Sequence, residues 1–189
     1  MTSHMRQHAI EVLASAELIH DEAAVQAAVH AMADSICADL AESDPLIVCA
    51  MNGGLVPIAM LMPHLRFPFR IDYVHATRYR EKTHGQDLSW QREPERSFEG
   101  EHVLVIDDIL DEGYTLESIL AYFEAQNTAS LRAAVLVEKE HDRGVRPPID
   151  YLGLKVPDRY VFGCGMDYKG YWRNLPTIHA LAESSEETH

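Results

Sequence analysis

Near the start of the chain, apolar residues follow the repeat of an α-helix. They recur at steps of three or four residues, which places them on one helix face, at Val25, Val29, Met32, Ile36 and Leu40. We expect the first forty residues to be helical, with Asp21 as a helix N-cap. The segment Ser43-Asp44-Pro45 should end this helical part, because the residue before a proline disfavours helical backbone angles.

Farther along, short apolar runs alternate with amphipathic segments. The run LIVCAM at 46–51 is partly β-branched and closes with Asn-Gly-Gly, which predicts a buried strand and a turn. The run HVLVI at 102–106 is the clearest buried strand. Further strands are expected at 69–77, 131–138, 151–156 and 160–163, and helices at about 55–65 and 115–126. This alternation predicts an α/β fold with a doubly wound, mostly parallel sheet flanked by helices, in which ligands bind at the carboxyl ends of strands.

Polar stretches separate some of the expected elements. Residues 78–89 (RYREKTHGQDLS) lack periodicity and predict a long loop, of a length that is often functional. Residues 90–98 are expected to return as an irregular hairpin arm, and residues 107–114 to form a turn.

Charge and cysteine content narrow the class of protein. The 189 residues suit one domain, and 16 Lys+Arg against 30 Asp+Glu give a formal net charge of −14. This acidity argues against binding duplex nucleic acid or an anionic membrane surface, and we expect neither partner. Three cysteines, distant in sequence, and the lack of a signal peptide indicate buried thiols in the cytoplasm. The uncharged stretch 45–65 is interrupted by Asn-Gly-Gly and two prolines, so it is not expected to span a membrane.

The segment HVLVIDDILDEGYTL at 102–116 is the most informative chemically. Three acids, Asp107, Asp108 and Asp111, follow a buried strand within five positions. Such carboxylates repel one another unless they meet hydroxyl groups or a metal. Gly113 and Thr115 then lead into a helix N-terminus, where free N–H groups favour a phosphate. A phosphorylated sugar fits this combination, and a solvated acidic turn that caps a helix is the alternative reading of the same spacing.

The strand followed by DD-x-x-D-x-G-x-T resembles the phosphoribosyl-pyrophosphate (PRPP) signature of type I phosphoribosyltransferases. Other segments, in the order expected over about 45–176, make the chain similar to the hypoxanthine-guanine phosphoribosyltransferases. They are MNGG at 51–54, RY at 78–79, VEK at 137–139, PDRYVFG at 157–163, DY at 167–168 and YWRNLP at 171–176.

The resemblance implies the type I phosphoribosyltransferase fold as a single domain over 1–189. Its core would cover about 40–150, and a small purine-binding hood would form from about 1–40 and 151–180, followed by an acidic tail at 183–189. It implies purine salvage, in which the 5-phosphoribosyl group of PRPP passes to hypoxanthine or guanine and gives IMP or GMP and pyrophosphate. It also implies Mg²⁺ as cofactor, and a homodimer or homotetramer.

Roles for the acidic segment follow from the same resemblance. Asp107 and Asp108 would hold the ribose hydroxyls and contact the metal. Asp111 would accept the N7 proton of the base as general base. The 5′-phosphate would bind the backbone of Asp111, Glu112, Gly113, Tyr114 and Thr115 together with the Thr115 hydroxyl. Glu112 stands where relatives often have Thr or Ser, and we expect its side chain to point to solvent.

The pyrophosphate would bind around a cis Met51–Asn52 peptide, with the N–H groups of Asn52 and Gly53 as donors. Some relatives carry Lys in place of Asn52, so this chain has one charge fewer there. Arg173 would add a charged fork. Arg78 and Tyr79 open the loop that would close over PRPP.

The purine would bind at four positions. Lys139 would donate to O6 of the base, Tyr160 would stack on the ring, the carbonyl of Val161 would accept from the base edge, and Asp167 would bind a second Mg²⁺. Taken singly, Lys139 fits a solvated lysine at a strand end and Tyr160 fits a core aromatic. No role is assigned to His75 or His141.

Two alternatives to the enzyme stay open. One is a regulator of the same fold that contacts nucleic acid, which the acidic charge disfavours. The other is a phosphoacceptor signalling domain, which would carry its acid pair after its first strand, whereas here the pair lies deep in the chain before a Gly-x-Thr turn.

Overall fold

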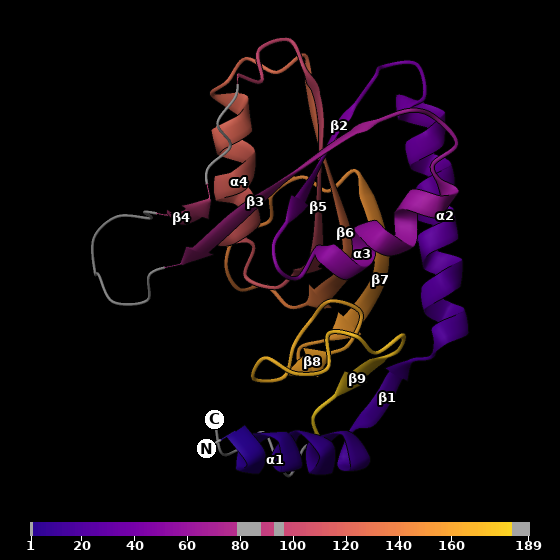
Figure 1. Ribbon diagram of the computed structural model, residues 1–189, viewed down its shortest axis with the longest axis vertical. Helices are drawn as coiled ribbons and strands as arrows, with labels where there is room; N and C mark the ends of the chain where they lie inside the picture. Colours follow the sequence, from indigo (N-terminus) through magenta and orange to yellow (C-terminus); the bar gives the residue numbers. More distant parts are fainter. Residues whose placement is uncertain (1, 79–87, 93–96, 183–189) are drawn as a thin grey trace.

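The computed structural model describes residues 2–78, 88–92 and 97–182, in two sheets (Figure 1). The larger sheet has the strand order β4-β3-β2-β5-β6-β7, and the smaller has the order β1-β9-β8. Their bounds are β1 (Glu17–His20), β2 (Leu46–Ala50), β3 (Arg70–Arg78), β4 (Leu88–Arg92), β5 (His102–Leu110), β6 (Ser130–Glu140), β7 (Tyr151–Pro157), β8 (Val161–Phe162) and β9 (Ile178–Ala180). Strands β3, β2, β5, β6 and β7 run parallel to one another. Strand β4 runs antiparallel to β3 at one edge of the sheet. The predicted doubly wound, mostly parallel α/β sheet is confirmed.

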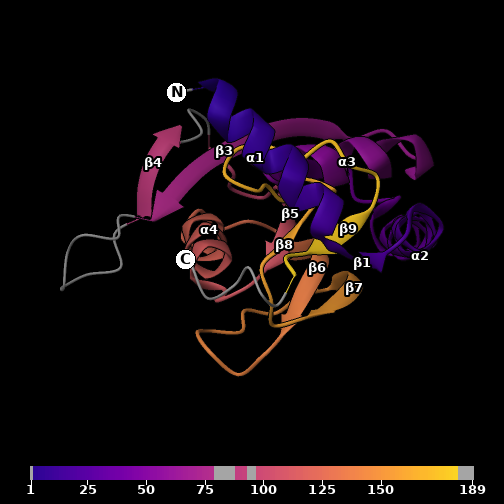
Figure 2. The same ribbon diagram turned by 90° about the horizontal axis from the view of Figure 1, so that it is seen from below.

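Helices cover both faces of the larger sheet, as the view from below shows (Figure 2). The helices are α1 (Thr2–Ser15), α2 (Glu22–Leu40), α3 (Leu55–Leu61) and α4 (Tyr114–Glu124), with a 3₁₀ turn at Met62–His64. Alternate residues of a strand point to opposite faces, and this divides the core in two. Ile47 and Cys49 pack with α2 and α3, whereas Val48 and Ala50 pack with α4.

The smaller sheet and α1 form the hood, which lies beyond the carboxyl ends of β5, β6 and β7 in Figure 1. Helix α1 is fastened there by the Trp172 indole N–H, which donates to the Ala9 carbonyl at 2.7 Å. The segments expected to build the hood, 1–40 and 151–180, also contain α2 and β7, which pack with the larger sheet instead. The long apolar face of α2 is buried against this sheet, and β7 is itself the edge strand of the sheet, paired with β6.

Most expected elements are present, but two strands were not foreseen. The prediction that the first forty residues are helical is wrong at β1, which separates α1 from α2. β1 pairs with β9 more than 150 residues later, through Glu17 and Ala180, so neither strand has a local signal. Asp21 is the N-cap of α2 as predicted, and its carboxylate accepts from the Ala24 N–H at 2.8 Å.

The predicted turn at 107–114 is too long, because β5 continues to Leu110. Parallel pairing with β6 holds the backbone extended up to the Leu110–Glu138 pair. Only Asp111 to Gly113 form the turn, and α4 begins at Tyr114. The acidic pair therefore sits inside a strand, at its carboxyl end.

The expected loop at 78–89 is only partly described: Arg78 ends β3 and residues 88 and 89 begin β4, while 79–87 lie outside the described residues. β4 returns antiparallel to β3, which confirms the hairpin arm for 90–92. The uncharged stretch 45–65 forms β2, a turn and α3 as predicted. Among the helices described here, none is long and apolar enough to cross a membrane.

Burial of α2 gives a stability prediction. Ile36 is 0% exposed between α2 and the sheet, whereas Ile10 of α1 is 37% exposed. Ile36→Ala should lower the free energy of unfolding by about 2–5 kcal/mol, because it removes buried methyl groups and leaves a cavity. Ile10→Ala, the matched control, should stay within about 0.5 kcal/mol of the parent. Urea unfolding followed by circular dichroism measures both, and equal losses would contradict the assigned core.

Candidate active site

The acidic pair lies at the carboxyl end of β5. Asp107 accepts the Asp108 N–H at 2.9 Å, and Asp108 accepts the Ile109 N–H at 2.9 Å. Burial, with repulsion from Asp108, raises the pKa of Asp107 well above its ordinary value. Burial also raises the pKa of Asp108, although Arg173 acts against this. The pair therefore suits hydroxyl donors or a cation, either of which would favour the ionised carboxylates.

The turn after β2 packs closely against this pair. The Met51–Asn52 peptide bond is cis, as expected. A Cβ atom on Gly53 would lie 2.1 Å from Asp108 Oδ2, so only glycine lets the backbone approach the carboxylate here. Asn52 is exposed, next to this contact. The structure thus brings the predicted pyrophosphate turn and the acidic pair together.

The turn from Asp111 to Gly113 leads into α4. Gly113 is the N-cap with φ = 82°, and no side chain caps the helix. A Cβ atom on Gly113 would lie 2.2 Å from the Val145 carbonyl oxygen, so both the backbone angle and the space require glycine. Glu112 is exposed as expected, and Thr115 is half-buried in the first turn of the helix. This helix N-terminus is the place where the sequence predicts an anion site.

Asp111 is held by two donors. Lys139 Nζ lies 2.8 Å from Asp111 Oδ2, and His141 Nε2 lies 2.8 Å from Asp111 Oδ1. Burial acts to raise the pKa of Asp111, but the hydrogen bonds from Lys139 and His141 outweigh it and lower that pKa below its ordinary value. Asp111 is therefore ionised at neutral pH and able to accept a proton. His141 is the residue that sequence reasoning missed, since it follows β6 with no recognisable spacing.

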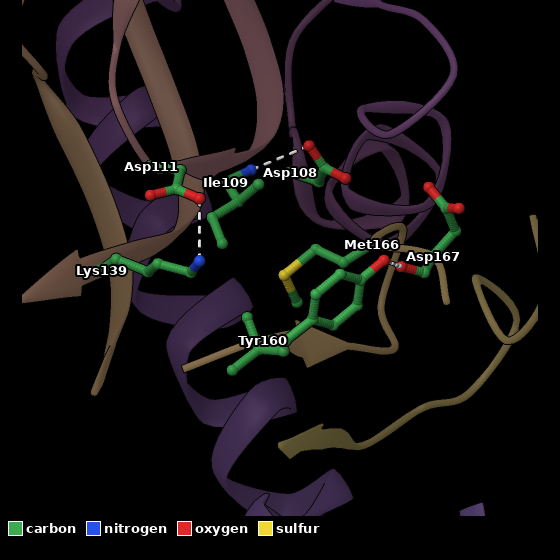
Figure 3. A pocket seen from close by; sticks show the side chains of 8 residues that line it. Asp108, Ile109, Asp111, Lys139, Tyr160, Met166 and Asp167 are labelled. Carbon is green, nitrogen blue, oxygen red and sulfur yellow. Dashed lines mark hydrogen bonds and ion pairs between the residues drawn. The ribbon is translucent and has the colours of Figure 1, made fainter. Parts of the chain in front are cut away.

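A pocket of about 200 Å³ opens between these elements and the hood (Figure 3). Asp111 and Lys139 line one side, and Tyr160, Met166 and Asp167 line the other. Tyr160 is 40% exposed, and its hydroxyl donates to the Asp167 carbonyl at 3.0 Å. Tyr160 is thus an accessible aromatic ring in the pocket. The remaining lining residues are Asp108, Ile109 and Val161.

Arg173 connects the acidic pair with the hood. Its guanidinium donates to the Gly165 carbonyl at 2.6 Å, pairs with the Asp167 carboxylate and lies 3.9 Å from Asp108 Oδ2. Arg173 therefore places a cation next to the buried pair, at the position where the sequence predicts a pyrophosphate contact. Of the other predicted contacts, Arg78 ends β3 but its side chain is outside the described part, and Tyr79 lies outside the described residues.

Carboxylate oxygens of the site differ in their freedom to bind a metal. Asp107 and Asp108 each use one oxygen for a backbone N–H, and the second oxygen of Asp108 has only the distant Arg173 guanidinium at 3.9 Å, so the pair can offer oxygens to a hard cation such as Mg²⁺. Asp167 accepts from the Gly170 N–H at 2.6 Å and pairs with Arg173, so it must give up one contact to bind a metal. The donors of the acidic pair therefore fit Mg²⁺ better than Asp167 does.

A second group of possible ligands offers a poorer metal site. Asp111, His141 and Asp158 have ligand atoms within 4.8 Å of one another. However, Lys139 and His141 already bind Asp111, and Arg143 pairs with Asp158. Hydrogen-bond donors therefore take the positions that a metal would need.

Sequence comparison gives matches over most of the chain. A family model for the phosphoribosyl transferase domain matches residues 15–169. A hypoxanthine-guanine-xanthine phosphoribosyltransferase of Tritrichomonas foetus is 29% identical over 168 residues, which cover 88% of this chain and 92% of that protein. A hypoxanthine-guanine phosphoribosyltransferase of Streptococcus pneumoniae is 30% identical over 165 residues, covering 87% and 91%.

Solved structures agree with these matches. A hypoxanthine phosphoribosyltransferase from Staphylococcus aureus superposes with a TM-score of 0.83 at 27% identity, covering 89% of this chain and 92% of that chain. The enzyme of the same name from Trypanosoma cruzi, in complex with the product IMP, gives a TM-score of 0.82 at 26% identity, covering 90% and 97%. This chain belongs to the phosphoribosyltransferase family and, within it, to the hypoxanthine-guanine phosphoribosyltransferases.

Proposed function

We propose that this enzyme transfers the 5-phosphoribosyl group of PRPP to hypoxanthine or guanine, giving IMP or GMP and pyrophosphate. The observation that carries the proposal is the pocket in which Asp108, Asp111, Lys139 and Tyr160 meet. In it, Asp108 can accept hydrogen bonds from hydroxyl groups, and ionised Asp111 can accept a proton. Lys139 can donate to a carbonyl oxygen, and the Tyr160 ring can stack on a base. These four groups together match a purine and a ribose.

PRPP would lie along the carboxyl end of β5. Asp107 and Asp108 would accept hydrogen bonds from the ribose hydroxyls, which favours their ionised forms. The 5′-phosphate would bind the N–H groups from Asp111 to Thr115 at the start of α4, where Gly113 lets the backbone turn toward it. The Thr115 hydroxyl adds one donor. Glu112 and Tyr114 would contribute only their backbone in this arrangement.

The base would sit between Lys139 and Tyr160. Tyr160 stacks on the purine, and Lys139 donates to O6, which selects 6-oxopurines over adenine. The Val161 carbonyl accepts from the edge of the base. For this contact, Lys139 turns from Asp111 Oδ2 toward O6, a movement that its flexible four-carbon chain permits. Asp111 Oδ2 then becomes available to the base.

The reaction breaks one bond and forms another at C1 of the ribose. N9 of the base attacks C1 while the bond from C1 to the pyrophosphate oxygen breaks, through a transition state of oxocarbenium character. The N7 proton of the base passes to Asp111, and the bonding electrons leave with pyrophosphate. Proton acceptance by a positioned carboxylate accelerates such steps by about 10²–10⁴-fold.

Pyrophosphate needs charge compensation in an acidic protein. Asn52 and Gly53 would donate their backbone N–H groups, and Arg173 would add a guanidinium. Arg78 and Tyr79 complete the proposed set. We propose Mg²⁺ as the cofactor, held by Asp107 and Asp108 with Asp167 at a second position. When bound, Mg²⁺ neutralises the negative charge that develops on the leaving pyrophosphate.

We also propose that the chain forms a homodimer or homotetramer. Leu55 of α3 and Ile71 of β3 are large apolar side chains that are more than half exposed. Exposed apolar side chains of this size favour a surface that another subunit covers. A cytoplasmic location is proposed because Cys37, Cys49 and Cys164 are all free thiols.

Product analysis tests the function directly. Purified protein is incubated with PRPP, Mg²⁺ and, separately, hypoxanthine, guanine, xanthine and adenine, and the products are separated by chromatography. IMP and GMP should form, AMP should not, and chelation of Mg²⁺ should abolish turnover because the leaving group loses its neutralising charge. Nucleotide formation that persists in excess chelator would contradict the metal proposal, and no IMP or GMP under any condition would contradict the function.

Asp111→Asn tests the general base. The amide keeps the size of the side chain but accepts no proton, so turnover should fall by about 10²–10⁴-fold with little change in the affinity for PRPP. Single-turnover kinetics and PRPP binding by calorimetry measure the two effects. Asp34→Asn, at an exposed carboxylate on α2, is the matched control and should behave as the parent. Unchanged turnover in Asp111→Asn would remove Asp111 from this role.

Lys139→Ala tests base recognition. Loss of a charge-assisted hydrogen bond to O6 should raise the KM for hypoxanthine and guanine by about ten- to a hundredfold. Lys155→Ala, at an exposed lysine on the neighbouring strand β7, is the control. Steady-state kinetics with both bases measure the change. Equal KM values for Lys139→Ala and the parent would refute the contact with O6.

A further inference from the structure

The segment that follows β6 folds back over the turn that carries Asp111. The Val145 N–H donates to the Glu112 carbonyl at 2.8 Å, and a Cβ atom on Gly144 would lie 2.1 Å from the same oxygen. The Arg146 guanidinium also donates to the Asp111 carbonyl. The backbone around Asp111 is therefore fixed by residues about thirty positions later in the chain.

His141 begins this segment, and its surroundings define its tautomer. Its Nδ1 atom lies 3.1 Å from the Arg143 N–H and 2.8 Å from the Arg146 guanidinium. A backbone N–H and a guanidinium only donate, so Nδ1 accepts and carries no proton. The ring proton is then on Nε2, which lies 2.8 Å from Asp111 Oδ1 and donates to it. The His141 side chain is 4% exposed, so water does not compete for these contacts.

We propose that His141 is a positioning residue for Asp111: its Nε2–H holds Oδ1, so that Oδ2 of the carboxylate faces the base. This inference rests on the function proposed above and adds a residue to it. Two different donors bind the two oxygens of Asp111. Lys139, on Oδ2, has a flexible chain and a second acceptor in the base. His141, on Oδ1, is held by Arg146 through both its ring and its carbonyl, the latter at 2.7 Å.

The consequence is a fixed direction of proton transfer. When Lys139 turns to the base, Asp111 keeps its orientation because the bond to His141 remains. Oδ2 is then the oxygen that receives the N7 proton. A carboxylate free to rotate would present either oxygen and lose the alignment on which proton transfer depends.

Loss of the His141 donor should change the pH dependence in a defined direction. The hydrogen bond from His141 favours the ionised carboxylate and helps to lower the pKa of Asp111. Without this hydrogen bond, Asp111 takes up a proton at higher pH, and the acid limb of the pH–rate profile shifts to higher pH. Other charged groups around Asp111 are Lys139 of β6, Arg146, Arg143 with its partner Asp158, and Glu112. They are the same in every variant below.

Two amide variants separate the donor from the volume of the side chain. In His141→Gln, the amide N–H reaches about as far as Nε2, whereas in His141→Asn it is one methylene too short. Single-turnover rates with PRPP and hypoxanthine across pH should show the acid limb of His141→Asn about one pH unit higher than in the parent, with PRPP affinity unchanged. His141→Gln should lie near the parent. His102→Asn, at a histidine bonded to Ser130 at the other end of β5, should not shift the limb.

Nitrogen-15 NMR of the parent enzyme gives a second test that needs no variant. The His141 ring should be neutral with its proton on Nε2. A proton on Nδ1, or an acid limb in His141→Asn equal to that of the parent, would overturn the proposal. These outcomes differ from failure of the proposed function, because that failure means no IMP from the parent enzyme at all.

Discussion

The register between β5 and β6 is the constraint on which the site depends. Parallel pairing runs through Leu110 and Glu138. The next residues along the chain are Asp111, which opens the turn after β5, and Lys139 of β6. Their side chains then meet at 2.8 Å, where β5 gives way to the turn before α4. A shift of one residue would send one of the two side chains to the opposite face of the sheet. The proposed base and the proposed O6 donor are therefore placed by the same backbone hydrogen bonds.

The site also explains how an acidic protein can handle a polyanion. The net charge of −14 does not favour the approach of PRPP, which is itself a polyanion. Individual cations instead stand next to individual carboxylates: Lys139 at Asp111, and Arg173 between Asp108 and Asp167. Each of these pairs places a charge-assisted donor in the pocket before substrate arrives. Substrate groups then replace protein carboxylates as the acceptors.

The sequence predicted the parts that depend on local pattern. The apolar runs identified β2, β5 and β6, because buried parallel strands read as continuous hydrophobic segments. Asp21 was recognisable as an N-cap, and Gly113 as the residue that turns the chain toward α4. The order of motifs brought Asp108, Asp111, Lys139, Tyr160 and Asp167 to one pocket, as the structure has them.

What the sequence did not reveal depends on distant partners. β1 and β9 are three or four residues long and exist because Glu17 meets Ala180. Pairing with β6 sets the length of β5. Asp107 and Asp108, which the sequence predicted in a turn, therefore lie in a strand. His141 is held by its contacts with Arg146 and Asp111, and no spacing rule in the sequence links it to either residue. Local pattern therefore gave the chemistry of the site, and tertiary packing gave its geometry.

A crystal structure with IMP tests the central claim most directly, because the nucleotide carries a base, a diol and a phosphate in one molecule. The account predicts that the purine lies on Tyr160 with O6 near Lys139, that the ribose hydroxyls face Asp107 and Asp108, and that the phosphate sits at the start of α4. IMP bound elsewhere, with the turn from Asp111 to Thr115 empty, would contradict it.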